Sequence, residues 1–275
     1  MKIASIFQEC EIALKEVIRI LYEERPDYFL LFLSRAEYFP QNENVSGLAP
    51  YLIDYTPDMY NNKYQRKFVV DYLQCNYSQE GFSYQEEKDV NDLITEMLIY
   101  SHIWEDVGFL KLLLRLSELL DQKDYAWSIE DIDYHKKLHT VVNERIIKSL
   151  KNRNLKLYEA IEIAYSTHIR DAFAHSMYSI DFENRRMHIW GGRTVEKKWE
   201  ETISFDAFQE KFLITTKIWN LLFGLVDDCR MCVAKEGWRC EIVLPAGKTL
   251  YLNAEIHKYR GEASFYGIVL KTDNK

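Results

Sequence analysis

Apolar residues recur at steps of three and four along much of the chain, and this spacing is that of an amphipathic helix. It predicts one helix over residues 5–35, bent or broken at Pro26, and a second over residues 92–120. Further helices with this spacing are predicted over residues 129–150, 155–175 and 205–233. The helix over 92–120 is apolar on more than one face, which predicts either a central position in a bundle or a place at a subunit interface.

The pattern changes from the helical period to the alternation of a strand directly after the fourth of these helices. Tyr178, Ile180 and Phe182 alternate with polar residues, residues 183–185 form the expected turn, and a second alternating strand follows. Residues 239–270 alternate in the same way over three short runs with turns between them. The sequence therefore predicts a small β-hairpin inserted among the helices and a short β-rich C-terminal tail.

Three parts of the chain differ in pattern, and together they predict a mainly α fold. Residues 1–91 form a mostly helical N-terminal appendage, in which sequence rich in tyrosine and asparagine follows the first helix. Residues 92–235 form a helical bundle that carries the hairpin, and residues 236–275 form a C-terminal β-meander. Because 47% of the 275 residues are apolar, the chain can bury a sizeable core.

Composition narrows the classes of function. The net charge of −8 argues against a protein that coats nucleic acid through bulk charge, although a small basic site remains compatible with it. Five cysteines, an odd number, fit a reducing compartment better than a secreted disulfide framework. No run of about 18 apolar residues is present, and acidic residues interrupt the N-terminus before an export signal forms. The sequence thus predicts a cytoplasmic protein without a membrane partner.

The hexapeptide RDAFAH, residues 170–175, places Arg170, Asp171 and His175 at the end of a predicted helix. About one arginine and histidine pair at this spacing is expected by chance in a chain with 7 histidines in 275 residues, so the spacing alone does not define a site. On an unbroken helix the two side chains lie roughly 140° apart around the axis. They serve one phosphate only if the helix breaks between them or if two subunits share the site, and the second arrangement predicts a two-fold dimer.

The order of elements around this hexapeptide resembles the HEPN superfamily of small helical bundles, many of which carry an arginine followed by a histidine after four to six residues. A polar residue commonly follows the arginine in that signature, and Asp171 occupies this position here. The resemblance covers residues 92–235 and implies a metal-independent endoribonuclease that acts as a homodimer, as in toxin, phage-defence and RNA-processing members. It implies RNA as the substrate, no metal or other cofactor and, in a toxin setting, a cognate inhibitor protein.

The residue types of the signature suit RNA cleavage without a metal. Histidine titrates near neutral pH and can accept the proton of the 2′-hydroxyl or protonate the leaving 5′-oxygen. Arginine stays charged and can stabilise negative charge on the phosphoryl oxygens, and an aspartate can orient either partner by a hydrogen bond. The predicted catalytic residues are therefore Arg170, His175 and Asp171. The expected products end in a 2′,3′-cyclic phosphate and a 5′-hydroxyl.

The predicted substrate-binding residues flank the signature: His168, Tyr178, Arg185 and Arg186. The two arginines begin a basic group on the predicted hairpin and its exit, which also contains Arg193, Lys197 and Lys198. This group can guide single-stranded RNA into the site of an otherwise acidic protein. A solvated basic patch accounts for the same residues.

Alternatives remain open for these candidates. Arg170 and His175 can be cations that stabilise the C-terminal end of a helix, or residues that hold a dimer interface in a structural module. A non-catalytic member of the same fold can also bind nucleotide, RNA or a partner protein through the same pocket. His135 and His139 have the spacing of two zinc ligands, but no third ligand follows at a suitable distance, so an exposed histidine pair is favoured.

Overall fold

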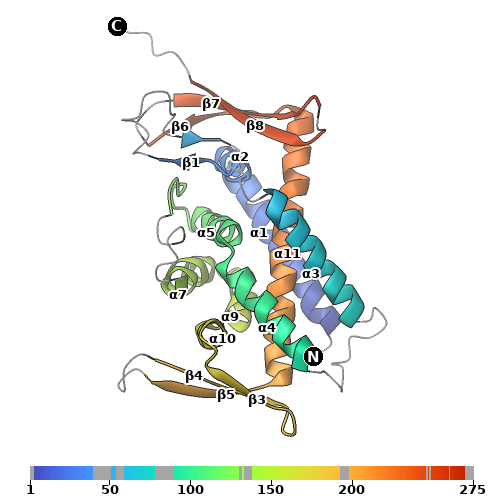
Figure 1. Ribbon diagram of the computed structural model, residues 1–275. Helices are drawn as coiled ribbons and strands as arrows, with labels where there is room; N and C mark the ends of the chain where they lie inside the picture. Colours follow the sequence, from blue (N-terminus) through green and yellow to red (C-terminus); the bar gives the residue numbers. More distant parts are fainter. Residues whose placement is uncertain are drawn as a thin grey trace.

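The computed structural model describes residues 3–39, 51–53, 59–77, 90–129, 132, 138–192, 198–245, 247, 249–259 and 261–269. Within this part the chain is mainly helical and contains three small antiparallel sheets, which confirms the predicted fold class at this level. The long helix α11 (Phe205–Glu236) runs through the molecule, with a three-stranded sheet near each of its ends (Figure 1). One helix therefore spans the distance between the two sheets.

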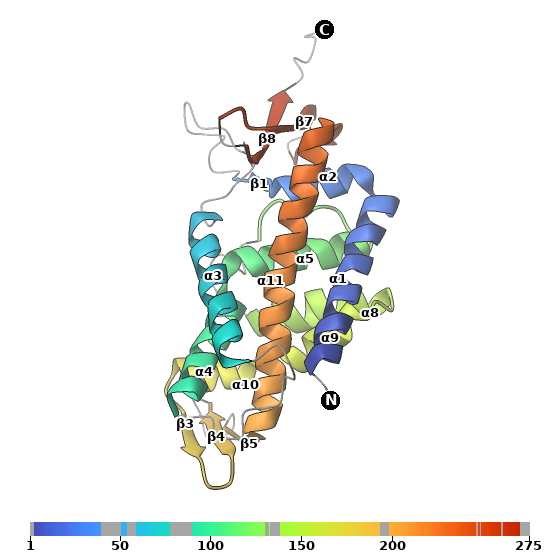
Figure 2. The same ribbon diagram turned by 90° about the vertical axis from the view of Figure 1, so that its right-hand side faces the viewer.

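The N-terminal part supplies three helices and a short strand pair: α1 (Ile3–Glu24), α2 (Pro26–Ser34), α3 (Met59–Asn76), β1 (Glu37–Tyr38) and β2 (Tyr51–Leu52). Proline occupies the first position of α2, where its missing N–H costs no hydrogen bond, so the predicted break at Pro26 is confirmed. Helices α1 and α3 lie on either side of α11 (Figure 2). Buried side chains of all these helices belong to the same hydrophobic cluster as those of the C-terminal sheet, so the three parts of the chain share one core.

The single helix predicted over residues 92–120 is wrong, because the chain forms two helices, α4 (Val90–Glu105) and α5 (Val107–Leu120), that meet at Asp106. The Asp106 side chain caps α5 by accepting a hydrogen bond from the backbone N–H of Phe109 at 3.1 Å. Its other oxygen accepts a hydrogen bond from the indole of Trp219 on α11 at 2.9 Å. One aspartate therefore starts α5 and ties the corner between α4 and α5 to the central helix.

The apolar surface of α5 is covered within the chain. Every residue from Phe109 to Leu120 is buried, so no face of this part of the helix reaches solvent. For this part of the predicted segment the central position is correct, and residues 109–120 offer no apolar face to a second subunit. On α4, by contrast, Leu98 remains 57% exposed.

Shorter helices follow α5. Residues 138–152 form one helical stretch made of α7 (Leu138–Thr140), a π-helical segment (Val141–Ile147) and α8 (Lys148–Asn152). Most of the predicted start of this helix lies outside the described residues. The helix predicted over 155–175 is also wrong as a single element, because it forms two, α9 (Leu157–Ala164) and α10 (Thr167–Ala174). The backbone of Tyr165 is extended between them, and the Ser166 hydroxyl caps α10 by accepting from the N–H of Ile169 at 3.3 Å.

The predicted hairpin is part of a three-stranded sheet. Strands β3 (Tyr178–Asp181) and β4 (Arg186–Gly191) form the hairpin, and β5 (Trp199–Ser204), which the alternation does not predict, pairs antiparallel with β4. Within β5 only Ile203 is buried, so this strand carries no alternating apolar signal. The C-terminal meander is confirmed as β6 (Arg239–Val243), β7 (Thr249–Ile256) and β8 (Ala263–Val269).

Candidate functional site between α10 and the β3–β4–β5 sheet

The corner between α9 and α10 fixes the position of the arginine and histidine signature. The buried hydroxyl of Tyr100 on α4 donates a hydrogen bond to the carbonyl of Ala164 at 2.8 Å and accepts one from the backbone N–H of Ser166 at 2.8 Å. Burial raises the pKa of Tyr100, so the hydroxyl keeps the proton that it donates. Helix α10 is thus anchored to the bundle at its start, and the signature lies at its other end.

Helix α10 continues unbroken from Arg170 to Ala174 and ends at His175. The backbone N–H of His175 still donates to the carbonyl of Asp171 at 3.1 Å, and Ser176 then adopts the left-handed conformation with φ of 54°. The chain enters β3 from there. No helix break therefore separates Arg170 from His175, and the side chain that shares a face with His175 is that of Asp171, four residues before it.

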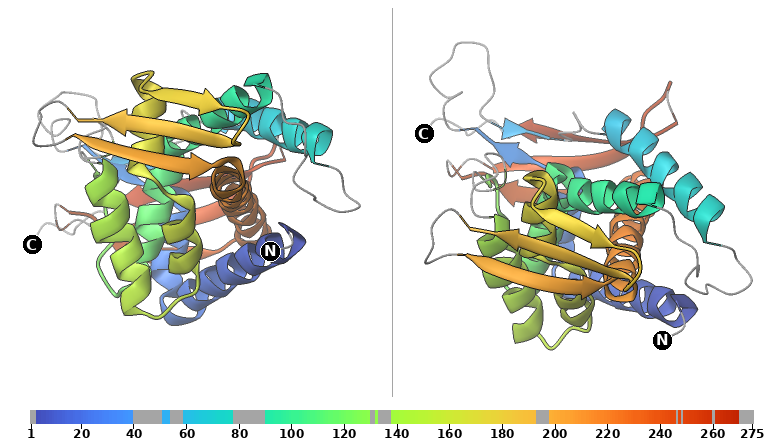
Figure 3. Two further views of the ribbon diagram at one scale, coloured as in Figure 1. Left: turned by 90° about the horizontal axis from the view of Figure 1, so that it is seen from below. Right: turned by 60° about the horizontal axis from the view of Figure 1, so that its bottom comes forward.

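Asp171 and His175 line a hollow of about 330 Å³ between α10 and the ends of β4 and β5. Its other lining residues are Met177, Trp190, Gly191, Gly192 and Trp199. The β3–β4–β5 sheet lies at one end of the molecule (Figure 3), and α10 packs against β4 there. Because His175 and Trp190 are exposed, the hollow opens to solvent.

The position of Trp199 in this hollow depends on Gly191. The two residues are paired across β4 and β5, and a Cβ atom at position 191 would lie 2.4 Å from the Trp199 ring, so only glycine leaves room for the indole. The same ring stacks on the imidazole of His168, with centroids 4.0 Å apart and planes inclined by 10°. Glu201 lies 3.0 Å from Nδ1 of that imidazole. His168 therefore supports a wall of the hollow.

Arg170 is turned toward its neighbour in the sequence. Its Nε and Nη2 atoms donate hydrogen bonds to Oδ1 of Asp171 at 3.2 and 2.7 Å, and only 13% of its side chain is exposed. Burial is the largest single effect and disfavours the charged guanidinium, but the hydrogen bonds to Asp171 and the charge interactions with Tyr165, Asp171 and Glu105 together outweigh it, so the pKa of Arg170 is raised above its ordinary value. The third nitrogen, Nη1, is buried and has no hydrogen-bond partner among the described residues. Arg170 is thus a charged group beside the hollow with one unused nitrogen.

Arg185 and Arg186 lie at the far end of the sheet from the hollow. Arg186 is four residues before Trp190 on β4, a separation of about 13 Å along a strand. Arg185 occupies the turn between β3 and β4, where its guanidinium lies 3.5 Å from Asp206. Tyr178 lies closer to the hollow, stacked on an aromatic side chain of α10, but does not line it. The structure therefore does not bring these three predicted substrate-binding residues to the signature.

Sequence reasoning missed the two tryptophans of the hollow. Trp190 begins the sequence WGG at the end of β4, and a glycine within a strand often marks a close approach of another group, so a local signal for a ring contact was present. Trp199 reaches the same place only through the pairing of β5 with β4. No short motif encodes that pairing.

Among the described residues, no three histidine, cysteine, aspartate or glutamate side chains are grouped so that they could hold a metal ion. No helix in the same part of the chain is both long and apolar enough to cross a membrane. His135, Arg193 and Lys197 lie outside the described residues. The sequence matches no protein-family model, and comparisons with curated proteins and with solved structures find no match either. Function has to be inferred from the geometry of the site itself.

Proposed function

We propose that this protein is a metal-independent endoribonuclease of the HEPN type, which cleaves single-stranded RNA at the hollow between α10 and the β3–β4–β5 sheet. The observation that carries the proposal is that Asp171 and His175 of the signature line one hollow together with two tryptophan side chains. An exposed imidazole beside aromatic rings combines a group for proton transfer with a surface for an unpaired base.

Each residue of the signature has a proposed role. His175 is the general acid or base, because its side chain is exposed in the hollow and histidine titrates near neutral pH. Arg170, a charged group beside the hollow, stabilises negative charge on the phosphoryl oxygens. Asp171 is a positioning residue that orients the guanidinium through the two hydrogen bonds to its Oδ1 atom. Trp190 and Trp199 stack on a base, which favours single-stranded over paired RNA.

We also propose that the protein acts as a homodimer. Arg170 precedes His175 by five residues on an unbroken helix, so the two side chains diverge by roughly 140° around its axis. A second copy related by a two-fold axis supplies the group that each single site lacks. Because α5 is buried, the proposed interface involves α10 and the neighbouring sheet instead. A toxin or phage-defence role in the cytoplasm, restrained by a cognate inhibitor protein, completes this proposal.

The alternative is a module of the same fold that binds RNA or nucleotide without cleaving it. The pairing of Arg170 with Asp171 favours this alternative, because a guanidinium that already contacts a carboxylate stabilises a phosphate less than a free one. The stacked tryptophan and histidine pair suits base binding in either case.

The test is cleavage of a mixed-sequence single-stranded RNA, with EDTA present, by the wild type and by Arg170→Ala and His175→Ala. His188→Ala is the matched control, because His188 is exposed on β4 and does not line the hollow. Each variant is checked for folding and for dimer mass. We expect cleavage by the wild type and the control only, with 2′,3′-cyclic phosphate ends. RNA binding without cleavage by the folded wild type would favour the binding module, and equal cleavage by all four proteins would contradict both functions.

A further inference from the structure

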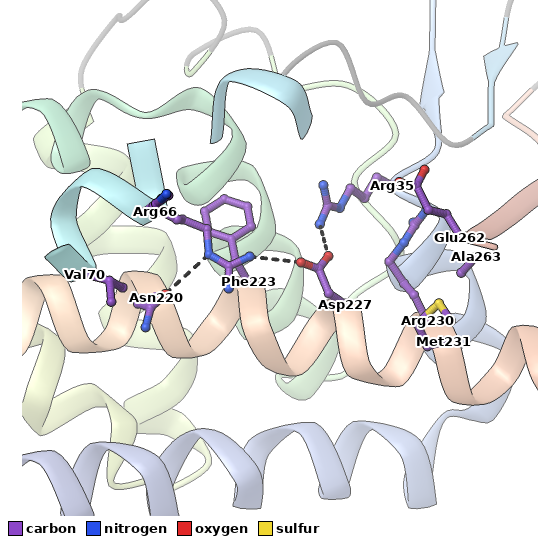
Figure 4. Close-up of a pocket in the computed structure, with 11 residues that line it drawn as sticks. Arg35, Arg66, Val70, Asn220, Phe223, Asp227, Arg230, Met231, Glu262 and Ala263 are labelled. Atoms are coloured by element: carbon purple, nitrogen blue, oxygen red, sulfur yellow. Dashed lines mark hydrogen bonds and ion pairs between the residues drawn. The ribbon is translucent and has the colours of Figure 1, made fainter. Parts of the chain in front are cut away.

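A second, larger hollow of about 520 Å³ lies between α3, α11 and the start of β8 (Figure 4). Four basic side chains line it against two acidic ones: Arg35, Arg66, Lys67 and Arg230 against Asp227 and Glu262. Apolar parts of the lining come from Val70 on α3 and Met231 on α11, among others. The whole protein carries a net charge of −8, whereas the lining of this hollow is net positive.

Asp227 lies between two of the arginines (Figure 4). Its Oδ2 atom is 3.0 Å from Nη1 of Arg66, and its Oδ1 atom is 3.5 Å from Nη2 of Arg35, so one carboxylate bridges two guanidinium groups. Both guanidinium groups also lie near the ring of Phe223, at 5.9 and 5.7 Å from its centroid. Since 45% of the Asp227 side chain is exposed, the bridge is accessible from solvent. The two arginines are thus already arranged around an anionic group.

The carboxylate of Asp227 does not neutralise all the positive charge of this hollow. Arg66 donates hydrogen bonds from Nε to Asn220 at 3.4 Å and from Nη1 to Asp227, and its Nη2 atom has no hydrogen-bond partner among the described residues. Lys67 follows Arg66 on α3, is exposed, and makes no ion pair with any described residue. A guanidinium edge and an ammonium group at neighbouring positions therefore remain available to a ligand.

The backbone conformation of Arg35 also supports a binding role for this hollow. This residue follows α2 in the left-handed conformation, with φ of 52°, where a glycine is usual and where any other residue is strained by about 1 kcal/mol. Its side chain is only 11% exposed and reaches Asp227 across the hollow. An arginine at a position that suits glycine indicates that the side chain, rather than the backbone, sets the choice of residue.

We propose that this hollow binds a small organic phosphate. The phosphate group of the ligand contacts Arg66 and Lys67 beside the Asp227 bridge, and the apolar part of the ligand lies against Val70 and Met231. The volume falls within the range of about 300 to 1,000 Å³ that ligand sites occupy. Phosphate suits the site better than a singly charged anion, because it carries up to two negative charges and accepts several charge-assisted hydrogen bonds at once. The site shares no lining residue with the α10 hollow, so it is independent of the proposed ribonuclease activity.

The experiment is calorimetric titration of the full chain with AMP, ribose 5-phosphate and inorganic phosphate at low chloride concentration. The variants are Lys67→Ala and Arg66→Met, and Lys148→Ala is the matched control, because Lys148 is an exposed lysine on α8 outside this hollow. Arg170→Ala is included to separate this site from the α10 hollow. Lys67 is exposed and unpaired among the described residues, so its removal tests binding even if Arg66→Met fails to fold.

We expect AMP or ribose 5-phosphate to bind more tightly than inorganic phosphate, and added salt to weaken binding. Lys67→Ala and Arg66→Met each weaken it by about tenfold or more, while Lys148→Ala and Arg170→Ala leave it unchanged. The proposal is overturned if neither organic phosphate binds the wild type, if Lys67→Ala binds as tightly as the wild type, or if inorganic phosphate binds as tightly as the organic ones. Loss of binding in Arg170→Ala would place the ligand in the α10 hollow instead.

Discussion

The α10 hollow and the hollow between α3 and α11 differ in how they use aromatic and charged side chains. In the α10 hollow, Trp190 is 40% exposed, and the nearby arginine is paired with a carboxylate from its own helix. In the hollow between α3 and α11, Phe223 is only 2% exposed, and basic side chains outnumber acidic ones by four to two. The first therefore presents a ring to a ligand, whereas the second presents charge.

This difference separates two kinds of recognition. An exposed ring stacks on a flat base and discriminates little between anions, whereas a group of guanidinium and ammonium groups selects phosphate and is weakened by salt. Among the described residues, the only histidine in either lining is His175 of the α10 hollow, so proton transfer is expected there and binding alone is expected at the other site. Variants that affect one hollow and spare the other test this separation.

The largest expected effect is on RNA cleavage. His175→Ala removes the proposed acid or base and is expected to slow cleavage by about 10² to 10⁴-fold. Lys67→Ala, in the other hollow, is expected to leave the rate unchanged, because Lys67 does not line the α10 hollow. Initial rates with a fluorescent single-stranded RNA measure both. A similar loss of rate in the two variants would show that the hollows do not act separately.

A smaller effect is expected on RNA binding. Trp190→Ala removes an exposed ring from the α10 hollow and is expected to cost about 1 to 3 kcal/mol of binding free energy, the range for one stacked base. The measurement is fluorescence anisotropy of a short RNA in a His175→Ala background, which prevents cleavage. Phe182→Ala is the control. Phe182 directly follows β3 of the same sheet and is 37% exposed, but it does not line the hollow. Equal losses in both variants would argue against stacking in this hollow.

A comparable effect on stability is expected at Gly191. Gly191→Ala places a Cβ atom 2.4 Å from the Trp199 ring, so the indole has to move, and overpacking of this kind costs about 1 to 3 kcal/mol of unfolding free energy. Urea unfolding followed by tryptophan fluorescence measures the loss. The same variant is expected to weaken RNA binding, because Trp199 is a wall of the hollow. Unchanged stability would mean that the indole has room that the structure does not give it.

The fold was predictable from sequence as far as local patterns extend. The apolar period correctly indicates α11 and the helical bundle, but it runs without interruption across Asp106 and across the Tyr165–Ser166 corner. Both breaks arise from capping side chains, Asp106 and Ser166, and a cap is visible in sequence only as one polar residue in a periodic run. Strand β5 was not predicted because it buries only Ile203 and therefore shows no alternation of apolar and polar residues.

The two sites also differ in how far the sequence predicts them. Arg170, Asp171 and His175 are close in sequence, so a short motif suffices to single them out. The rings that complete their hollow come from strand pairing. In the other hollow, Arg35, Arg66, Asp227 and Glu262 come from four distant parts of the chain and meet only in the folded state. No spacing rule relates them, and so the sequence carried no signal for this site.

The smallest expected effect is at Gly224 on α11, which lies beside Arg66 of the second hollow. Gly224 lies within α11, where alanine is favoured over glycine by up to about 1 kcal/mol, and an added Cβ atom would meet Nη2 of Arg66 at 3.5 Å, an ordinary contact. Gly224→Ala is therefore expected to raise the unfolding free energy slightly and to leave RNA cleavage unchanged. Because the new methyl group partly covers the Arg66 nitrogen, AMP binding should weaken only a few-fold, less than in Lys67→Ala. Urea unfolding and calorimetry measure the two quantities, and a loss of stability as large as that of Gly191→Ala would mean that the second hollow is packed as tightly as the first.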